Sequence, residues 1–256
     1  MDRKRNSALI CYICCIIMLL FMINNGSLEK KASLAVPDQD EIALFSSSWD
    51  WGNYDKPTAS VSSCVPIQFD EDSSEDVLIG SYDSNAYIIS GSTGETLFTF
   101  SKPRFSVDSV LWGNFAGNES KDLLVGSSDN SAYLVDGATH NFLWKTPEEY
   151  PSGSVSAATG SDRDGDGREE VFIASEDGFI YGLEGNTGDL IWISDTQMMG
   201  KPTKLIAVDI DLDGVSDIIA GTDLGVYAFS GVNGSMAWSD NSSFAVTDLM
   251  LNPLYA

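Results

Sequence analysis

The chain is poor in the residues on which hydrolytic, zinc and nucleic-acid-binding sites depend. Its 256 residues include one histidine, His140, and 14 lysines and arginines against 38 aspartates and glutamates, so the formal charge is −24. With a single histidine, neither a Ser-His-Asp triad nor a histidine-rich zinc site can be built. Because no basic surface could follow a phosphate backbone, nucleic acid is excluded as a partner.

Cysteine is equally scarce in the part of the chain that is expected to fold. Three of the four cysteines, Cys11, Cys14 and Cys15, lie in one apolar run near the start, and Cys64 is the only thiol beyond it. No internal disulfide framework can therefore form.

Long hydrophobic runs are absent apart from residues 8–23, which follow the basic cluster Arg3, Lys4 and Arg5. This run is long for the apolar part of a signal peptide and slightly short of the roughly 20 residues of a spanning helix. We therefore expect residues 1–24 to form a hydrophobic helix, either a signal peptide or an N-terminal membrane anchor. In both cases the basic cluster stays inside, and the rest of the chain is extracytoplasmic, secreted or held at the membrane.

The remainder of the chain repeats one pattern four times. A short apolar run is followed by an acidic turn, a tyrosine, a glycine and an aromatic residue, and the tyrosines recur after 46, 48 and 46 residues. The runs are too short for helices, are rich in Val, Ile, Tyr and Phe, and are separated by Gly, Asp, Asn and Ser. A period of this length with such runs predicts an all-β fold, a β-propeller with one blade per repeat. The predicted blades are 57–103, 104–149, 150–196 and 197–243.

The two ends of the repeat region contain partial repeats. Residues 244–256 begin like the first strand of a new blade, and Ile42–Trp51, within the predicted linker 25–56, aligns with the last strand of a preceding one. A strand from each end could build a composite fifth blade and close the ring, which would protect the edges of the sheets. The alternative is a truncated array whose last blade is incomplete.

Several repeated residues are expected to be structural. The aromatic residues Trp144, Trp192 and Trp238 occur once per blade, as residues that pack between blades should. His140 occupies the turn position that Gly94, Gly188 and Gly234 hold in the other repeats. We therefore expect a left-handed turn residue at His140 instead of a catalytic base.

The third and fourth repeats contain the acidic loop D-x-D-x-D-G-x-x-[DE], at residues 162–170 and 209–217. Carboxylates at alternating positions can surround one hard cation, and their density suits Ca²⁺. An EF-hand is excluded, because position 12 is Ile173 in one loop and Ala220 in the other. The predicted ligands are the side chains of Asp162, Asp164, Asp166, Glu170, Asp209, Asp211, Asp213 and Asp217, with the backbone carbonyls of Arg168 and Val215.

The other two loops fit the pattern less well. The first, residues 68–76, has Gln68 at position 1 and lacks the glycine, and the second, residues 114–122, keeps one carboxylate among the ligand positions. Metal binding is not expected in the second loop. For all four loops, the alternative is an Asx-rich turn between strands that binds no metal.

The acidic loop with its following small-residue strand resembles the FG-GAP (VCBS-type) repeats of integrin-like propellers. The segment Tyr181–Trp192 resembles the tryptophan-docking repeat of quinoprotein (PQQ-type) propellers. The resemblance covers about residues 57–243 and implies a propeller with Ca²⁺ in its loops. By itself it implies no activity, because this fold supports many functions.

The function expected from these features is a non-catalytic, extracytoplasmic calcium-binding propeller that binds a protein or glycan partner, as an adhesion or scaffold module. A dehydrogenase similar to the quinoproteins is the first alternative. That family resembles rings with more blades and has an adjacent cysteine pair near its cofactor, whereas the repeat region of this chain has Cys64 alone. A calcium-dependent polysaccharide lyase is a second, without a recognisable catalytic constellation. A third is an assembly scaffold resembling the outer-membrane propeller lipoprotein, which would need a lipidated cysteine.

Overall fold

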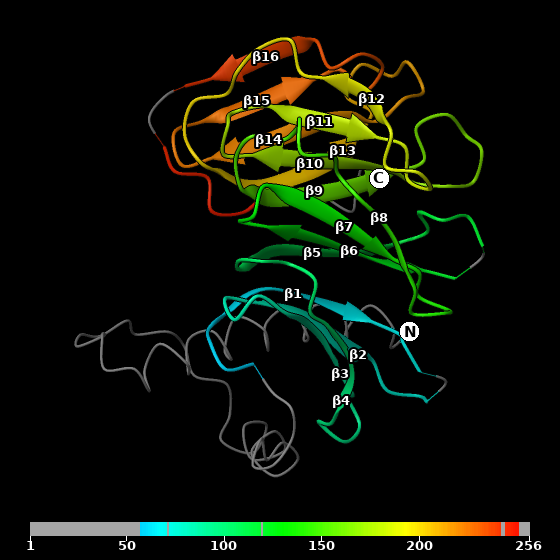
Figure 1. The fold of residues 1–256 in the computed structure, drawn as a ribbon. Coiled ribbons are helices and arrows are strands. Elements are labelled where there is room, and N and C mark those ends of the chain that lie inside the picture. The colour runs from blue at the N-terminus through cyan, green and yellow to red at the C-terminus, as the bar shows by residue number, and fades with distance from the viewer. Residues whose placement is uncertain (1–56, 71, 119, 242–243, 251–256) are drawn as a thin grey trace, which may run out of the picture.

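The computed structural model describes residues 57–70, 72–118, 120–241 and 244–250, and within them all regular structure is β-strand. Four antiparallel sheets of four strands follow one another along the chain, stacked in an arc in Figure 1. We call them blades 1 to 4 in chain order. The expected N-terminal helix and linker, residues 1–56, lie outside the described residues.

The strands of each blade pair in chain order, so neighbours in sequence are neighbours in the sheet. Blade 1 contains β1 (Val61–Ile67), β2 (Asp76–Ser81), β3 (Ala86–Ile89) and β4 (Thr96–Phe100). Blade 2 contains β5 (Val107–Gly113), β6 (Asp122–Ser127), β7 (Ser131–Val135) and β8 (Phe142–Lys145). Blade 3 contains β9 (Val155–Ser161), β10 (Glu170–Ser175), β11 (Ile180–Leu183) and β12 (Leu190–Ile193). Blade 4 contains β13 (Pro202–Val208), β14 (Asp217–Thr222), β15 (Val226–Phe229) and β16 (Met236–Asp240).

The core lies between blades, as the short apolar runs require. The second strands β6, β10 and β14 are buried along their whole length, whereas half of the residues of β8 and of β12 are exposed. One apolar cluster joins blades 1 and 2, one joins blades 2 and 3, and one joins blades 3 and 4. Because a small sheet cannot cover both of its faces, each blade depends on its neighbour for part of its core.

Small residues in the second strands let the blades approach closely. A Cβ at Gly80 would lie 2.7 Å from Cγ1 of Val107, and one at Gly126 would lie 2.7 Å from Cγ1 of Val155. The first strands of successive blades consequently lie side by side, β1 with β5, β5 with β9 and β9 with β13.

The repeated tyrosines and acidic turns form one bonding unit. In the first three blades the tyrosine hydroxyl donates to the aspartate four residues earlier, and that aspartate also accepts a backbone N–H from the segment that enters the blade. The tyrosine–aspartate pairs are Tyr87–Asp83, Tyr133–Asp129 and Tyr181–Asp177. Blade 4 departs from this pattern, because the Tyr227 hydroxyl accepts the Met199 N–H at 2.9 Å.

Two expectations about single residues can be compared with the structure. His140 has a φ of 59°, so it is the predicted left-handed turn residue. Trp144 and Trp192 are 7% exposed and pack between blades as expected, but Trp238 is 45% exposed, because no described sheet follows blade 4.

Residues 244–250 contain no strand, yet they lie where the first strand of another blade would begin. The Val246 N–H donates to the Thr222 carbonyl at 2.8 Å, and the Val246 carbonyl accepts from Thr203 Oγ1 at 2.6 Å. Val246 covers Gly221 as Val155 covers Gly126. The partner strand expected from Ile42–Trp51 lies outside the described residues. Within the described part of the chain, no helix is long and apolar enough to cross a membrane.

Candidate functional site

The acidic loops all connect the first and second strands of their blades, and they lie beside the turns between the third and fourth strands. We call the surface made by the four loops, residues 68–76, 114–122, 162–170 and 209–217, the loop face. It contains the predicted metal ligands and a hollow between blades 1 and 2.

The carboxylate at loop position 9 is part of the fold. Asp76, Asp122 and Asp217 are at most 3% exposed. In each, one oxygen accepts the backbone N–H of loop position 2 at 3.0 Å, and the other accepts the N–H of the glycine that opens the third-to-fourth-strand turn at 3.1–3.2 Å. In the third loop, Glu170 accepts the position-2 N–H of Arg163 at 2.7 Å. The second loop has an acid at position 9, Asp122, although it lacks acids at the other ligand positions. The sequence thus indicates that the acid at position 9 is needed for the fold.

Burial changes the pKa of two of the position-9 acids, Asp122 and Glu170. Burial raises the pKa of Asp122, while N–H donors from Ala116, Gly137 and Phe115 oppose the rise. The pKa of Glu170 is also raised, mainly by burial and further by the charges of Asp164 and Glu184. A cation bound in the third loop would favour the ionised form of Glu170 and lower its pKa.

In the third and fourth loops the structure brings together the acids of positions 1, 3 and 9. Carboxylate oxygens of Asp162, Asp164 and Glu170 lie within 4.8 Å of one another, and those of Asp209, Asp211 and Asp217 do the same. The position-1 acids also accept backbone N–H groups, Asp162 from Gly165 and Gly167, and Asp209 from Asp213 and Gly214. Such bonds also occur in Asx-type turns that bind no metal.

The acids of position 5 are not in these groups. Asp166 accepts from the Arg168 backbone N–H and pairs with its guanidinium, and hydrogen bonds from Arg168 lower the pKa of Asp166. Asp213 accepts the Val215 N–H at 2.8 Å. The carbonyl oxygens of Arg168 and Val215 stay predicted ligands.

The first two loops differ from the third and fourth in what their position-1 side chains do. Asp70, Asp72 and Asp76 also form a group within 4.8 Å, but Gln68 Nε2 donates to the carbonyls of positions 3, 5 and 7 at 3.0–3.1 Å. This amide makes the contacts with carbonyl oxygens that a cation would make. In the second loop, Asn114 Nδ2 donates to the Gly167 carbonyl of the third loop at 2.8 Å, so the amide ties two blades together.

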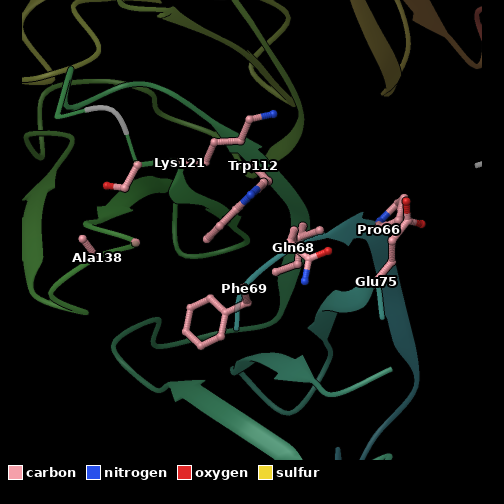
Figure 2. Close-up of a pocket in the computed structure, with 10 residues that line it drawn as sticks. Pro66, Gln68, Phe69, Glu75, Trp112, Lys121 and Ala138 are labelled. Atoms are coloured by element: carbon pink, nitrogen blue, oxygen red, sulfur yellow. The ribbon is translucent and has the colours of Figure 1, made fainter. Parts of the chain in front are cut away.

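A hollow of about 490 Å³ opens on the loop face between blades 1 and 2. Phe69 comes from the first loop and Trp112 from β5, with ring centroids 6.0 Å apart, and His140 stacks on the Phe69 ring at 4.8 Å. Figure 2 shows the Trp112 ring between Lys121 and Phe69, with Glu75 on the far side of Gln68. Two aromatic rings, one basic side chain and one acidic side chain thus line the same hollow. The sequence analysis did not predict this hollow, because it needs side chains from two blades.

Comparison with solved structures identifies the architecture. The chain is similar to the computationally designed Ika4 protein, with a TM-score of 0.54 and 16% identity, covering 70% of this chain and 95% of that one. It is also similar to the WD40 β-propeller domain of Doa1, with a TM-score of 0.51 and 17% identity, covering 65% of this chain and 50% of that one. The fold is a β-propeller. At these identities the likeness shows the fold alone.

A chain of the mitotic checkpoint complex matches with a TM-score of 0.54 and 13% identity, covering 67% of this chain and 51% of that one. This propeller therefore spans about half the length of these two natural chains. No family model and no curated protein sequence matches the chain.

Proposed function

We propose that this propeller is a non-catalytic binding module that is stabilised by calcium and displays its loop face outside the cytoplasm to a protein or glycan partner. The observation that supports calcium binding is that the third and fourth loops have acids at positions 1 and 3, where the second loop has none. Position 9 has hydrogen bonds that explain its acid, whereas the second loop forms with Asn114 and Ala116 at positions 1 and 3. The acids at these two positions in the third and fourth loops accept backbone N–H groups of their own loops, but the second loop shows that a loop can form here without them, so their charge is available for a cation.

Calcium suits these positions for two reasons. Three carboxylates within 4.8 Å repel one another when ionised, and a divalent cation removes that repulsion. The donors are all oxygens, which Ca²⁺ prefers, and it takes about six to eight of them. The three grouped acids of each loop would supply part of this shell. Asp166 and Asp213 would supply further oxygen ligands if their side chains turned toward the ion, and the position-7 carbonyls would supply others. To do so, Asp166 would give up its ion pair with Arg168.

The hollow on the loop face is the proposed contact surface for the partner. Aromatic faces beside a few polar groups suit both sugars and protein side chains, because the rings give apolar contact and the polar groups give orientation. Export follows from the basic cluster and apolar run at the N-terminus, and membrane attachment through that run is part of the proposal.

Calcium titration of the full chain tests the metal part. A ligand that binds only the folded state at about 100 times its dissociation constant adds roughly 2.7 kcal/mol to stability. Calcium should therefore raise the melting temperature and a chelator should reverse the rise. Asp164→Asn and Asp211→Asn should each remove one site's share, measured by calorimetry. The matched control is Asp72→Asn in the first loop, which should leave calcium binding unchanged. A melting temperature that ignores both calcium and chelator would contradict the proposal.

Screening the full chain on glycan and protein arrays tests the partner part. Lys121→Ala and Glu75→Ala change the walls of the hollow without removing the apolar packing of Trp112. Each should weaken binding to any ligand found, by about tenfold for one lost charge-assisted hydrogen bond of roughly 1.4 kcal/mol. Lys145→Ala on β8, away from the hollow, is the control. A ligand that all three variants bind equally well would contradict the proposal that the hollow is the binding surface.

A further inference from the structure

The turn between the third and fourth strands is closed by the same kind of side-chain hydrogen bond in blades 1, 3 and 4. In blades 1 and 3, Oγ1 of Thr93 and of Thr187 accepts the backbone N–H two residues later, at 3.2 Å. In blade 4, Asn233 Oδ1 accepts the Ser235 N–H at 2.9 Å. Threonine and asparagine side chains both close turns in this way. Asn233 therefore replaces a threonine without changing the turn.

Blade 4 differs from the other blades at two positions of this turn. The position of Asn233 is a threonine in each of the others, at Thr93, Thr139 and Thr187, and the position of Ser235 is Glu95, Asn141 or Asp189. The two differences together produce Asn233-Gly-Ser235, which has the form Asn-x-Ser of an N-glycan acceptor. Since threonine closes the turn equally well, the turn itself requires neither the asparagine nor the serine.

The amide of Asn233 is accessible for modification. Asn233 is an exposed residue whose Oδ1 is held by the Ser235 N–H, while no described residue accepts a hydrogen bond from its Nδ2. The contacts that hold the turn use other atoms. The Gly234 N–H donates to the Ser230 carbonyl at 2.8 Å, and the Trp192 ring packs on Gly234. A sugar bonded to Nδ2 would break none of these contacts.

A second tripeptide of this form, residues 118–120, lies in a different environment. Asn118 Nδ2 donates to Asp136 Oδ2 at 2.7 Å, and Asn118 Oδ1 accepts from Ser120 Oγ at 2.6 Å. The fold thus uses both the amide nitrogen and the hydroxyl. Ser120 also lines the hollow, so a glycan here would stand beside the proposed contact surface. A third tripeptide, residues 241–243, extends outside the described residues.

The turn of Asn233 leads into an exposed edge strand. β16 is the outer strand of blade 4, and all five of its residues are exposed, including Met236 at 38% and Trp238 at 45%. An uncovered edge offers free N–H and C=O groups to strands of other molecules. A glycan three residues before β16 would shield this edge. Because blade 4 lies at the other end of the arc from blades 1 and 2 (Figure 1), the hollow would stay open.

We propose that Asn233 is an N-glycosylation site and that its glycan shields the edge strand β16. The inference rests on the export that is part of the proposed function. In the transfer, Nδ2 bonds to the anomeric carbon of an oligosaccharide carried on a lipid pyrophosphate, and the bond from that carbon to the phosphate oxygen breaks. The lipid pyrophosphate leaves with the electron pair, and the amide proton passes to a base of the oligosaccharyltransferase. The transferase and the lipid-linked oligosaccharide come from the exporting cell.

Site-resolved mass spectrometry of the full chain, expressed in cells whose secretory pathway attaches N-glycans, tests the assignment. Peptide:N-glycosidase converts a glycosylated asparagine to aspartate, and an untreated sample corrects for spontaneous deamidation. The chain is expressed once with its own N-terminus and once behind an added cleavable signal peptide, which makes export independent of residues 1–24. Asn233 should be occupied in both forms, and the occupancy of Asn118 should be several-fold lower.

Asn233→Thr is the decisive variant, because it places at this position the residue that closes the turn in blades 1 and 3. It should lose the glycan and aggregate at a lower protein concentration than the glycosylated chain. Ser235→Ala should also lose the glycan, whereas Ser235→Thr should keep it. The double variant Thr187→Asn, Asp189→Ser builds the same tripeptide in the turn of blade 3 and should add an occupied site there.

The outcomes separate this inference from the proposed export. An unmodified Asn233 in the form with the added signal peptide, or equal occupancy at Asn118 and Asn233, would overturn the glycosylation site. Modification in that form alone would support the site and contradict export by the native N-terminus. If Asn233→Thr and the glycosylated chain were equally soluble, the shielding of β16 would be wrong.

Discussion

Single acids in this chain have separable physical roles. The aspartates of the second-to-third-strand turns bond to a tyrosine hydroxyl and to a backbone N–H about 25 residues earlier, and the acids of position 9 join a loop to a neighbouring turn. The first kind occurs in blades 1 to 3, and the second occurs in blades 1, 2 and 4. Acids at positions 1 and 3 occur in only some blades, and their hydrogen bonds stay within their own loops.

Asp83 illustrates how such an acid contributes to stability. Burial opposes its ionisation, but donors from Thr58 and Tyr87 prevail and lower its pKa below the usual 3.8. A lowered folded pKa stabilises the protein above the unfolded value, and this contribution is lost as the pH falls through the folded pKa. Asp83→Asn should therefore reduce stability at pH 7 by roughly 1 kcal/mol, discounted for partial exposure, and flatten the decline below about pH 4.

Urea unfolding at pH 7 and at pH 3 measures both effects. The control is Glu148→Gln, an exposed acid in the connection after β8. An Asp83→Asn protein with unchanged stability at pH 7 would show that the turn does not need the charge.

At the scale of elements, close backbone contact explains most of the repeated small residues. A Cβ on Gly91, Gly137 or Gly231 would overlap a carbonyl oxygen of the acidic loop in the same blade, so the loop is clamped against the turn. The second-strand glycines are needed for a different contact, with the first strand of the next blade. The C-terminal segment continues this second series, since Val246 covers Gly221.

This packing makes Val246 the residue through which the C-terminal segment stabilises blade 4. Val246→Asp should place a carboxylate against Gly221, beside Leu249, and lower the free energy of unfolding by about 1–3 kcal/mol. Met250→Asp in the same segment, where the side chain is 85% exposed, should change it little. Thermal unfolding of the two variants provides the measurement. If the two variants lowered the melting temperature equally, the loss would come from the added charge and not from lost packing of Val246.

At the scale of the whole molecule, four blades form an arc in which neighbouring blades both contribute side chains to the core between them. Blade 1 and blade 4 each have one neighbouring sheet among the described residues. The formal charge of −24 adds self-repulsion, which weakens the compact state at low ionic strength. Bound cations would reduce that repulsion.

Sequence alone determined the all-β class, the four blades and the residues of the turns, because these depend on contacts within one repeat, and the period of 46 to 48 residues makes every blade's hairpins visible. The grouping of acids in the third and fourth loops also followed, since neighbours in a nine-residue loop can hardly avoid one another. Their affinity for calcium stays a prediction. The left-handed turn at His140 was predictable from its alignment with glycines.

Tertiary structure alone decided which loop side chains point inward and which contacts join the blades. Asp166 turns to Arg168, Gln68 satisfies the carbonyls of the first loop, and Asp217 bonds to Gly231 fourteen residues away. The hollow beside Trp112 needs walls from two blades. Such features depend on the directions of side chains and on distances between segments that are remote in sequence. A repeat pattern contains neither kind of information, because it gives only the order and type of the residues.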